Sequence, residues 1–362
     1  MSGPQARPGV LQTPIYVPGK REIEGVSAPV KLSSNESPHG PGARALQVYA
    51  SLASTLCRYP DRAQDELRQA IARAHRLPTA QLVLGNGSDE LIQMVTRAYV
   101  GPGDEVILTD NCFAMCRTHA MGQGATIVAA PEPDFRVSVD EILTRVTPLT
   151  RLVAIASPNN PFGTHLPTSE LRRLHAGLPE NVILVVDAAY SEYVTDDDYD
   201  NGSTLAAEAS NVIMTRTLSK LYGLAALRIG WALTAPRIVE AIEHLRMPFN
   251  INAVAQSVAA AAVLDSDHAA YVRQYNSRER ARVSQAFREL GLQVVPSSAN
   301  FVLTLFRDGL RNGDRAYEYL ISRGIIPRPV GRAPYNSLRF TIGLESENDA
   351  MLAALREYMS GT

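Results

Sequence analysis

Short apolar runs alternate with amphipathic stretches along most of the chain. Three β-branched, mostly apolar runs lie at about residues 152–157, 181–187 and 211–217, and their lengths suit strands buried on both faces. From about residue 40 to residue 245, strand signals alternate with helix signals. This alternation is typical of a mostly parallel sheet sandwiched by helices, so we predict an α/β fold.

Both ends of the chain depart from this alternation. The first residues are rich in proline and glycine, which predicts an N-terminal arm without a fold of its own. The pattern breaks again at 247–250, and long helices rich in alanine and arginine and then a strand–helix–strand pattern follow. We therefore expect an arm (1–30), a large domain (31–250) and a small C-terminal α/β domain (251–362).

Composition narrows the class of protein. The chain has 362 residues, too many for one ordinary core, and it is 45% hydrophobic and 20% charged. The formal net charge is −2 without a basic run, which argues against binding to nucleic acid or to an anionic membrane. No apolar stretch reaches the roughly 18 residues of a membrane helix, and the first residues lack the apolar region of a signal peptide. We expect a cytoplasmic protein.

The cysteines agree with a reducing compartment. Cys57, Cys112 and Cys116 are too few for a disulfide framework. Cys112 and Cys116 have helical spacing but no histidine pair nearby, and the seven histidines show no spacing typical of a metal site. We therefore predict buried thiols at these two positions and no bound metal.

Lysine is rare in this chain, and one lysine stands at a chemically informative place. Lys20, Lys31 and Lys220 are the only lysines among the 35 lysine and arginine residues. Lys220 follows the run at 211–217, in a turn of small and hydroxylated residues. Its amine can form a Schiff base with a carbonyl compound or with pyridoxal phosphate, which a protonated, delocalised guanidinium cannot do. Lys220 therefore indicates covalent chemistry.

Polar side chains follow two other predicted strands. Asp187 ends the run at 181–187 and is followed by Tyr190, and Asn159 lies in the turn after the run at 152–157. In open α/β sheets, ligands bind at the carboxyl ends of the strands. Each of these residues alone has an ordinary structural explanation, such as a helix cap, but together with Lys220 they predict one binding site.

A glycine turn predicts an anion site. Residues 82–95 have the pattern of a strand, a turn at 85–87 and an amphipathic helix, with Ser88 or Asp89 as the N-cap. Free N–H groups and the helix dipole favour a phosphate at such a helix start. Further donors could come from Thr217, Ser219 and Arg228. A phosphorylated aldehyde cofactor fits this set of groups.

Six short segments occur in one order along the chain. They are LSSNESP at 32–38, GNGSDEL at 85–91, SPNNPFG at 157–163, DAAY at 187–190, TLSKLYGLAALRIGW at 217–231 and LRFTIG at 338–343. In this order and spacing, from about residue 16 to the C-terminus, the chain resembles the fold-type I pyridoxal-phosphate aminotransferases, and the histidinol-phosphate aminotransferases most closely. Each segment alone is a weak or moderate signal, whereas the ordered set is specific.

The resemblance implies pyridoxal 5'-phosphate as cofactor and a role for each matching residue. Lys220 would be the Schiff-base lysine and the general base that moves the proton at the substrate Cα. Asp187 would keep the pyridine nitrogen protonated, so that the ring can accept electrons. Tyr190 and Asn159 would bond the phenolic oxygen, and Phe113 would stack on the ring.

The resemblance also implies a phosphate site, a substrate site and a homodimer with shared active sites. Arg339 would bind the carboxylate or phosphate of the substrate, with help from Arg328. Asn159 would also face the substrate, as would Tyr16 of a second subunit. Tyr59 of that second subunit would reach the cofactor phosphate. The remaining phosphate ligands would be Ser88, Asp89, Thr217, Ser219 and Arg228.

The implied reaction is ping-pong amino transfer between histidinol phosphate and 2-oxoglutarate, because two arginines suit a phosphate or a dicarboxylate. An aromatic amino-acid aminotransferase is the nearest alternative, and a decarboxylase or lyase on the same scaffold would share the cofactor residues. A nicotinamide dehydrogenase is excluded because the glycine turn at 85–87 lacks the third glycine of Gly-x-Gly-x-x-Gly. A transcription regulator would need a DNA-binding module, for which too few residues precede the first segment.

Two positions depart from the pattern of the family. Phe162 stands where threonine is usual, and His39 stands where tyrosine or leucine is commoner. We expect neither residue to touch the catalytic atoms, and we expect Phe162 to alter the turn or the wall of the pocket.

Overall fold

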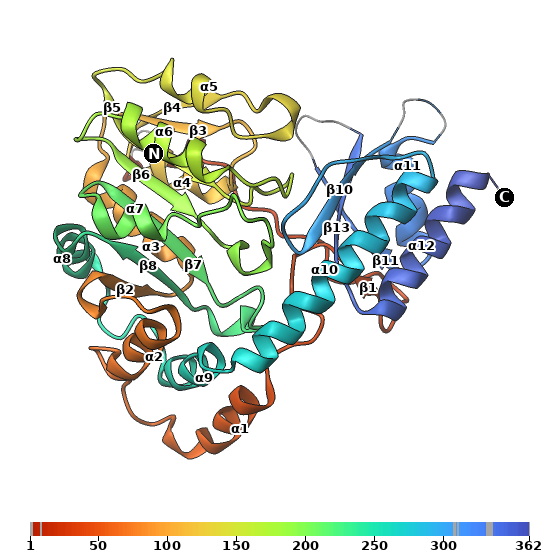
Figure 1. The fold of residues 1–362 in the computed structure, drawn as a ribbon, viewed down its shortest axis with the longest axis horizontal. Coiled ribbons are helices and arrows are strands. Elements are labelled where there is room, and N and C mark those ends of the chain that lie inside the picture. The colour runs from red at the N-terminus through yellow and green to blue at the C-terminus, as the bar shows by residue number, and fades with distance from the viewer. Residues whose placement is uncertain (1–2, 8, 307–308, 310, 331–335, 362) are drawn as a thin grey trace.

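The described part of the protein forms two bodies, each with its own β-structure and its own core (Figure 1). The computed structural model describes residues 3–7, 9–306, 309, 311–330 and 336–361. A single long helix, α10 (Ser266–Glu289), runs from one body to the other (Figure 1).

In the described part of the chain, a seven-stranded sheet forms the centre of the larger body. β8 is antiparallel to both of its neighbours, and all other neighbouring strands are parallel. The predicted mostly parallel sheet is therefore confirmed, and the three apolar runs of the sequence form β5, β6 and β7. The strand order is β2 (Leu82–Gly85), β8 (Gly230–Thr234), β7 (Val212–Thr217), β6 (Ile183–Asp187), β5 (Thr150–Ala156), β3 (Glu105–Thr109) and β4 (Thr126–Ala130).

Helices cover both faces of this sheet. Successive residues of a strand point to opposite faces, and the strands carry apolar residues on both, so both faces are buried. Val106, Leu152 and Ile213 lie in the core on one face. The helices on that face are α3 (Ser88–Tyr99), α4 (Ala114–Gly122) and α8 (Pro236–Leu245). Ile107 and Val153 lie in the core on the other face. The helices there are α2 (Asp65–His75), α5 (Val139–Leu143), α6 (Thr168–Gly177) and α7 (Ser203–Glu208).

The smaller body has a separate core between its own sheets and helices. Its antiparallel sheet has the order β12 (Arg328–Pro329), β13 (Ser337–Thr341), β10 (Phe301–Leu305) and β9 (Gln293–Val294). A second, parallel pair consists of β1 (Val30–Lys31) and β11 (Ile325–Ile326). The C-terminal half of α10 packs here together with α11 (Gly313–Ser322) and α12 (Glu345–Ser360).

The packing of the helices points to a boundary between the bodies that differs from residue 250. α9 (Ala253–Val263) packs against α1 (Ala43–Ser51) and α2, in the core of the larger body. α10 has Val272 in that core and Val283 in the core of the smaller body. Leu32 also lies in the smaller core. We therefore propose that the boundary lies inside α10 and that the segment around Leu32 belongs to the smaller body.

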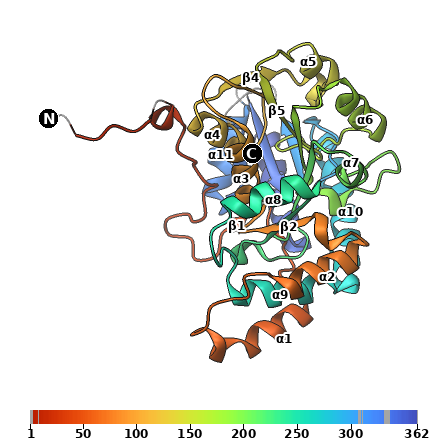
Figure 2. The ribbon, with the colours of Figure 1, turned by 90° about the vertical axis from the view of Figure 1, so that its left-hand side faces the viewer.

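The N-terminal segment contacts the end of α4 at Arg7, and the described residues before Arg7 extend away from the larger body (Figure 2). Arg7 Nη2 donates a hydrogen bond to the carbonyl oxygen of Gly122 at 3.1 Å, and the chain before it extends outward (Figure 2). Short 3-10 helices are η1 (Val10–Gln12), η2 (Ala53–Thr55), η3 (Thr79–Gln81), η4 (Pro133–Phe135), η5 (Ser191–Tyr193) and η6 (Ala225–Leu227).

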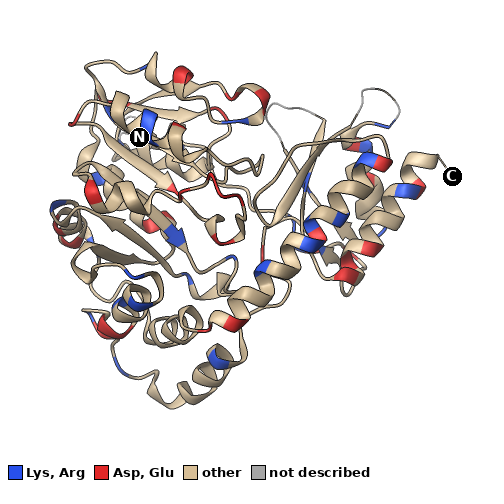
Figure 3. Ribbon diagram, in the orientation of Figure 1, with Lys and Arg blue, Asp and Glu red and all other residues tan. Residues whose placement is uncertain are grey.

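Charged residues lie mainly in helices and loops, and the strands contain few of them (Figure 3). Within the described ranges, no helix combines the length and the apolar character that crossing a membrane requires. The same residues contain no group of three or more histidine, cysteine, aspartate or glutamate side chains that could hold a metal ion.

Candidate active site

A pocket of about 550 Å³ is lined by residues of both bodies. From the larger body it includes Ala156, Asp187 and Thr217, which are the last residues of three neighbouring parallel strands. From the smaller body it includes Arg328 and Arg339. The pocket thus lies at the carboxyl ends of the strands, where ligands bind in open α/β sheets.

Lys220 lies in the turn that follows β7 and lines this pocket. Its Nζ atom is 3.4 Å from the carbonyl oxygen of Ser34 and 5.7 Å from the centre of the Tyr190 ring. Burial of the ammonium group, together with the nearby positive charge of Arg339, lowers the pKa of Lys220 to about 8. Near neutral pH a useful fraction of the amine is therefore neutral and able to act as a nucleophile or a base.

Asp187 ends β6 and faces the same pocket. Thr215 Oγ1 donates to Asp187 Oδ1 at 3.3 Å, and the backbone N–H of Ala189 donates to the same carboxylate. Burial raises the pKa of Asp187 to about 6, although these hydrogen bonds oppose the rise. A buried carboxylate of this kind is stabilised by a cationic partner, such as a protonated ring nitrogen.

Tyr190 is held by two side-chain amides. Asn35 Nδ2 donates to Tyr190 Oη at 2.9 Å, and Asn160 Nδ2 lies within 3.4 Å of the same oxygen. Asn160 Oδ1 accepts a hydrogen bond from Arg339 Nη1. These bonds join the end of β6 to an arginine of the smaller body.

Asn159, which was expected to face cofactor and substrate, lies behind the pocket. Its side chain is fully buried, and its Nδ2 donates to Glu132 Oε1. The neighbouring Asn160 lines the pocket and contacts Tyr190 instead. Adjacent residues in an extended turn point in different directions, so the sequence Asn-Asn did not show which amide faces the ligand. The sequence analysis also did not identify Asn35 as a contact of Tyr190, although it singled out the segment 32–38 that contains it.

Arg328 and Arg339 are register partners on β12 and β13. Arg339 Nη2 donates to the carbonyl oxygen of Ser33 at 2.8 Å, and Arg328 Nη2 donates to that of Val17 at 3.0 Å. Burial and the neighbouring charge of Arg328 lower the pKa of Arg339 to about 10. Two close guanidinium groups form a site for a phosphate or a carboxylate.

The aromatic residues predicted for the site have different positions. Phe113 immediately precedes α4 and lines the pocket. Tyr16 lines the pocket of its own chain, whereas the resemblance implied that a second subunit would supply it. Tyr59 is 84% exposed and stacks on Phe249, with 4.7 Å between the ring centres. It lies outside the pocket of its own chain.

The start of α3 forms one end of the pocket, with Ser88 and Asp89 among the lining residues. The residue that caps this helix is Gly87, not Ser88 or Asp89. Gly87 has a φ of 81°, a conformation that favours glycine. The first N–H groups of the helix are therefore available for an anion.

Hydroxyl and guanidinium groups lie opposite this helix start. Arg228 Nη1 donates to Ser219 Oγ at 3.2 Å, and Thr217 Oγ1 donates to Ser219 Oγ at 2.9 Å. A Cβ atom at Gly230 would collide with the backbone of Ser88, so glycine is needed for β8 to approach the helix start. The pocket thus contains the five phosphate-site residues predicted within one chain, whereas the sixth, Tyr59, lies outside it.

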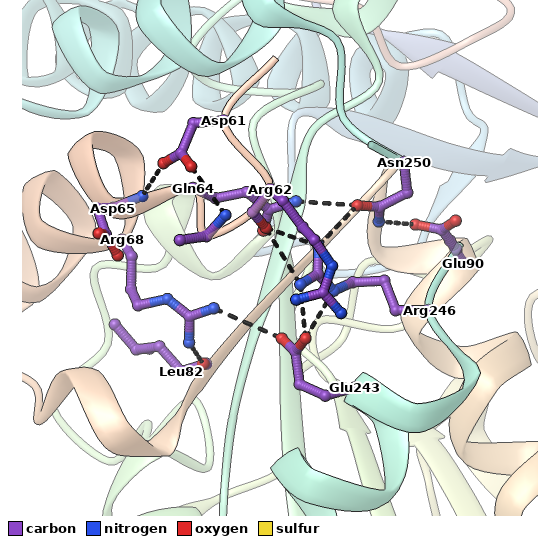
Figure 4. Close-up of polar contacts among 11 residues, drawn as sticks. Asp61, Arg62, Gln64, Asp65, Arg68, Leu82, Glu90, Glu243, Arg246 and Asn250 are labelled. Carbon is purple, nitrogen blue, oxygen red and sulfur yellow. Dashed lines mark hydrogen bonds and ion pairs between the residues drawn. The ribbon is translucent and has the colours of Figure 1, made fainter. Parts of the chain in front are cut away.

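A network of hydrogen bonds holds the first turn of α3 through Glu90 (Figure 4). Glu90 Oε2 accepts the backbone N–H of Asn86 at 2.6 Å and the side-chain amide of Asn250 at 2.7 Å. Asn250 Oδ1 accepts from Gln64 Nε2 at 2.9 Å and from Arg246 Nη1 at 3.2 Å (Figure 4). The network ties the turn before α3 to segments that precede α2 and follow α8.

Neither departure from the family pattern lies in the pocket lining. Phe162 is 1% exposed and packs with Leu303 in a small apolar cluster. It was expected to alter the turn or the wall of the pocket, and it does not form part of the wall. His39 packs edge-on against Tyr275, with 4.3 Å between the ring centres.

Comparison with known proteins agrees with this geometry. The family model "Aminotransferase class I and II" matches residues 27–355. Histidinol-phosphate aminotransferase of Rhodospirillum centenum is 41% identical, with all of both chains covered. The enzyme of the same name from Rhodopseudomonas palustris is 42% identical, with 99% of this chain and 100% of the relative covered.

A solved structure has the same fold. It is histidinol-phosphate aminotransferase from Sinorhizobium meliloti in complex with pyridoxal-5'-phosphate, with a TM-score of 0.91, 28% sequence identity and 99% of both chains covered. The predicted fold class is therefore confirmed. By sequence and by fold, the chain belongs to the class I and II aminotransferase family.

Proposed function

We propose that this protein is a pyridoxal-phosphate-dependent aminotransferase that transfers an amino group from glutamate to imidazole acetol phosphate, giving histidinol phosphate and 2-oxoglutarate. The observation that carries the proposal is that Lys220, Asp187 and the Arg328–Arg339 pair line one pocket. The names of relatives at 41% and 42% identity over almost the whole chain support the same substrate.

The pocket has groups that suit both the phosphate and the ring of pyridoxal phosphate. The start of α3 and the cluster of Thr217, Ser219 and Arg228 would hold the phosphate. Asp187 would pair with the ring nitrogen, and Lys220 would hold the aldehyde carbon. When bound, the cofactor supplies an aldehyde that takes up the amino group and a ring that accepts electrons from the substrate.

The residues of the chain supply binding, orientation and proton transfer. Lys220 takes a proton from the substrate Cα and later returns one, because burial lowers the pKa of its amine to about 8 and leaves part of it neutral near pH 7. Tyr190, held by Asn35 and Asn160, would present its hydroxyl group to the bound cofactor. Asp187 would keep a negative charge beside the ring nitrogen of the bound cofactor.

The two arginines favour the proposed substrates over aromatic amino acids. Arg328 and Arg339 together suit a phosphate or the two carboxylates of glutamate. Phenylalanine brings one carboxylate and an apolar ring, so it should depend on Arg339 and gain little from Arg328.

We also propose a homodimer with shared active sites, in which Tyr59 reaches the phosphate site of the second subunit. Exposed apolar side chains lie in the same part of the sequence as Tyr59, namely Leu46, Tyr49 and Leu56. An exposed apolar group of this kind suits contact with a second copy of the chain. The cytoplasmic location stays a prediction.

Steady-state assays with 2-oxoglutarate as acceptor test the substrate. We expect a higher kcat/KM for histidinol phosphate than for phenylalanine or tyrosine. A hydrogen bond to a charged group contributes about 1.5–3 kcal/mol, so Arg328→Ala should lower kcat/KM for histidinol phosphate by about 10- to 150-fold and that for phenylalanine far less.

Arg323→Ala is the matched control, because Arg323 pairs with Glu357 at the surface. A wild type that prefers phenylalanine or tyrosine would support the aromatic alternative. Release of carbon dioxide from an amino acid in place of amino transfer would support a decarboxylase.

A further inference from the structure

Glu132 joins two loops that line the pocket. Its Oε2 accepts the backbone N–H of Asn111 at 2.8 Å, and its Oε1 accepts from Asn159 Nδ2. The carboxyl group is partly buried, and burial raises the pKa of Glu132 while these two hydrogen bonds oppose the rise. Both oxygens of one carboxylate are thus used to hold segments that are far apart in the sequence.

The first loop contains Asn111 and Phe113, and both line the pocket. The hydrogen bond from Asn111 to Glu132 fixes the backbone two residues before Phe113. Phe113 is the residue proposed to stack on the cofactor ring. The carboxylate therefore acts on one wall of the proposed cofactor site.

The second loop contains Asn159 and Asn160. Among the described residues, no hydrogen-bond donor reaches Asn159 Oδ1, so the bond to Glu132 is the one that orients this buried amide. The next residue, Asn160, bonds both Tyr190 and Arg339. The orientation of Asn159 therefore affects the position of Asn160 and, through it, the position of Arg339, the arginine proposed to bind the substrate carboxylate.

The backbone after Glu132 holds the same loop at a second point. Asp134 and Phe135 have φ values of 51° and 62°, which are unfavourable for residues other than glycine. Contacts offset this strain, because the carbonyl oxygen of Phe135 accepts from Thr164 Oγ1 at 2.6 Å and its ring lies 5.4 Å from that of Phe162. The segment 132–135 therefore contacts the second loop at Asn159 and again at 162–164.

We propose that Glu132 is a positioning residue for amino transfer. It fixes the position of Arg339 through Asn159 and Asn160, and the position of Phe113 through Asn111. The proposal rests on the proposed function, since Arg339 and Phe113 have their roles from it. Glu132 is not among the residues that line the pocket, so it acts through the two loops.

Glu132→Gln tests this role because it keeps the size of the side chain and replaces one acceptor oxygen by a donor. Three quantities are measured: the thermal midpoint of the cofactor-free protein, the Kd of the holoenzyme for maleate, and kcat/KM for glutamate. Maleate is a non-reacting dicarboxylate that reports on Arg339 through the visible spectrum of the holoenzyme. Misplacement of a binding group costs about 10- to 100-fold, so we expect losses of this size in maleate affinity and in kcat/KM.

The control is Glu141→Gln, which removes a surface ion pair with Arg145 and should leave all three quantities unchanged. Asn159→Ala removes the donor to the same carboxylate, and the double variant with Glu132→Gln should be no worse than Glu132→Gln alone. If Glu132→Gln does not fold, Asn159→Ala carries the test, with the same expected loss of maleate affinity.

A purely structural Glu132 would lower the thermal midpoint and leave the maleate Kd and kcat/KM of the folded variant at wild-type values, which would overturn the proposal. Losses that multiply in the double variant would overturn the route through Asn159. A wild type that does not transaminate glutamate would refute the proposed function itself, whereas an active wild type with an unaffected Glu132→Gln variant refutes only the role of Glu132.

Discussion

Replacing Lys220 with methionine should stabilise the cofactor-free protein at neutral pH. Burial of the Lys220 ammonium group lowers its pKa from 10.5 to about 8. Each pKa unit corresponds to about 1.4 kcal/mol, so the buried charge costs the folded protein on the order of 3 kcal/mol. Methionine has a similar length and no charge, so the substitution removes this cost and keeps most of the packing.

The size of the effect depends on pH. Below about pH 8, Lys220 is protonated in the folded and in the unfolded protein, and the whole cost is present. Between about pH 8 and pH 10.5 the unfolded protein binds more protons than the folded one, so the stability of the wild type rises with pH. Above that range both states are neutral and the cost disappears.

Urea unfolding of the two cofactor-free proteins, followed by the fluorescence of the single tryptophan, Trp231, measures the difference. We expect Lys220→Met to be more stable by about 3 kcal/mol at pH 7 and by about 1 kcal/mol at pH 10. Lys31→Met is the matched control, because Lys31 forms a partly exposed ion pair with Glu36 and should change stability little. A Lys220→Met variant that is less stable at pH 7, or equally stabilised at both pH values, would refute the reasoning.

Three further substitutions test other parts of the structure. Lys220→Arg keeps a positive charge but removes the amine proposed to form the Schiff base, so the variant should fold, judged by circular dichroism, and show no turnover with glutamate; full turnover would exclude the proposed role. Asp187→Asn should still bind the cofactor but slow the single-turnover reaction with glutamate by orders of magnitude, because it removes a buried charged contact; an unchanged rate would leave Asp187 a structural role. Phe162→Ala should lower the free energy of unfolding by about 3–5 kcal/mol, because it empties a fully buried site, and a loss below about 1 kcal/mol in urea would show that the ring is poorly packed.

The sequence by itself determined the strands and placed candidate functional groups at their ends. The β-branched runs form β5, β6 and β7, because the length and apolar character of a buried strand are local properties. Asp187 and Lys220 were recognised for the same reason, since a carboxylate after a buried strand and a rare amine in a turn are visible without a fold. The shared edge of a parallel sheet then implied that these groups meet.

Only the tertiary structure decided which side chains face the ligand and which support them. Asn159 and Asn160 are adjacent and identical in type, and the contact of Asn159 with Glu132 separates their roles. Tyr16 lines the pocket of its own chain, and the carbonyl oxygen of the next residue, Val17, accepts a hydrogen bond from Arg328, more than 300 residues later. Folding brings such distant segments together through the whole packed structure, and a local pattern of apolar and polar residues does not specify these contacts.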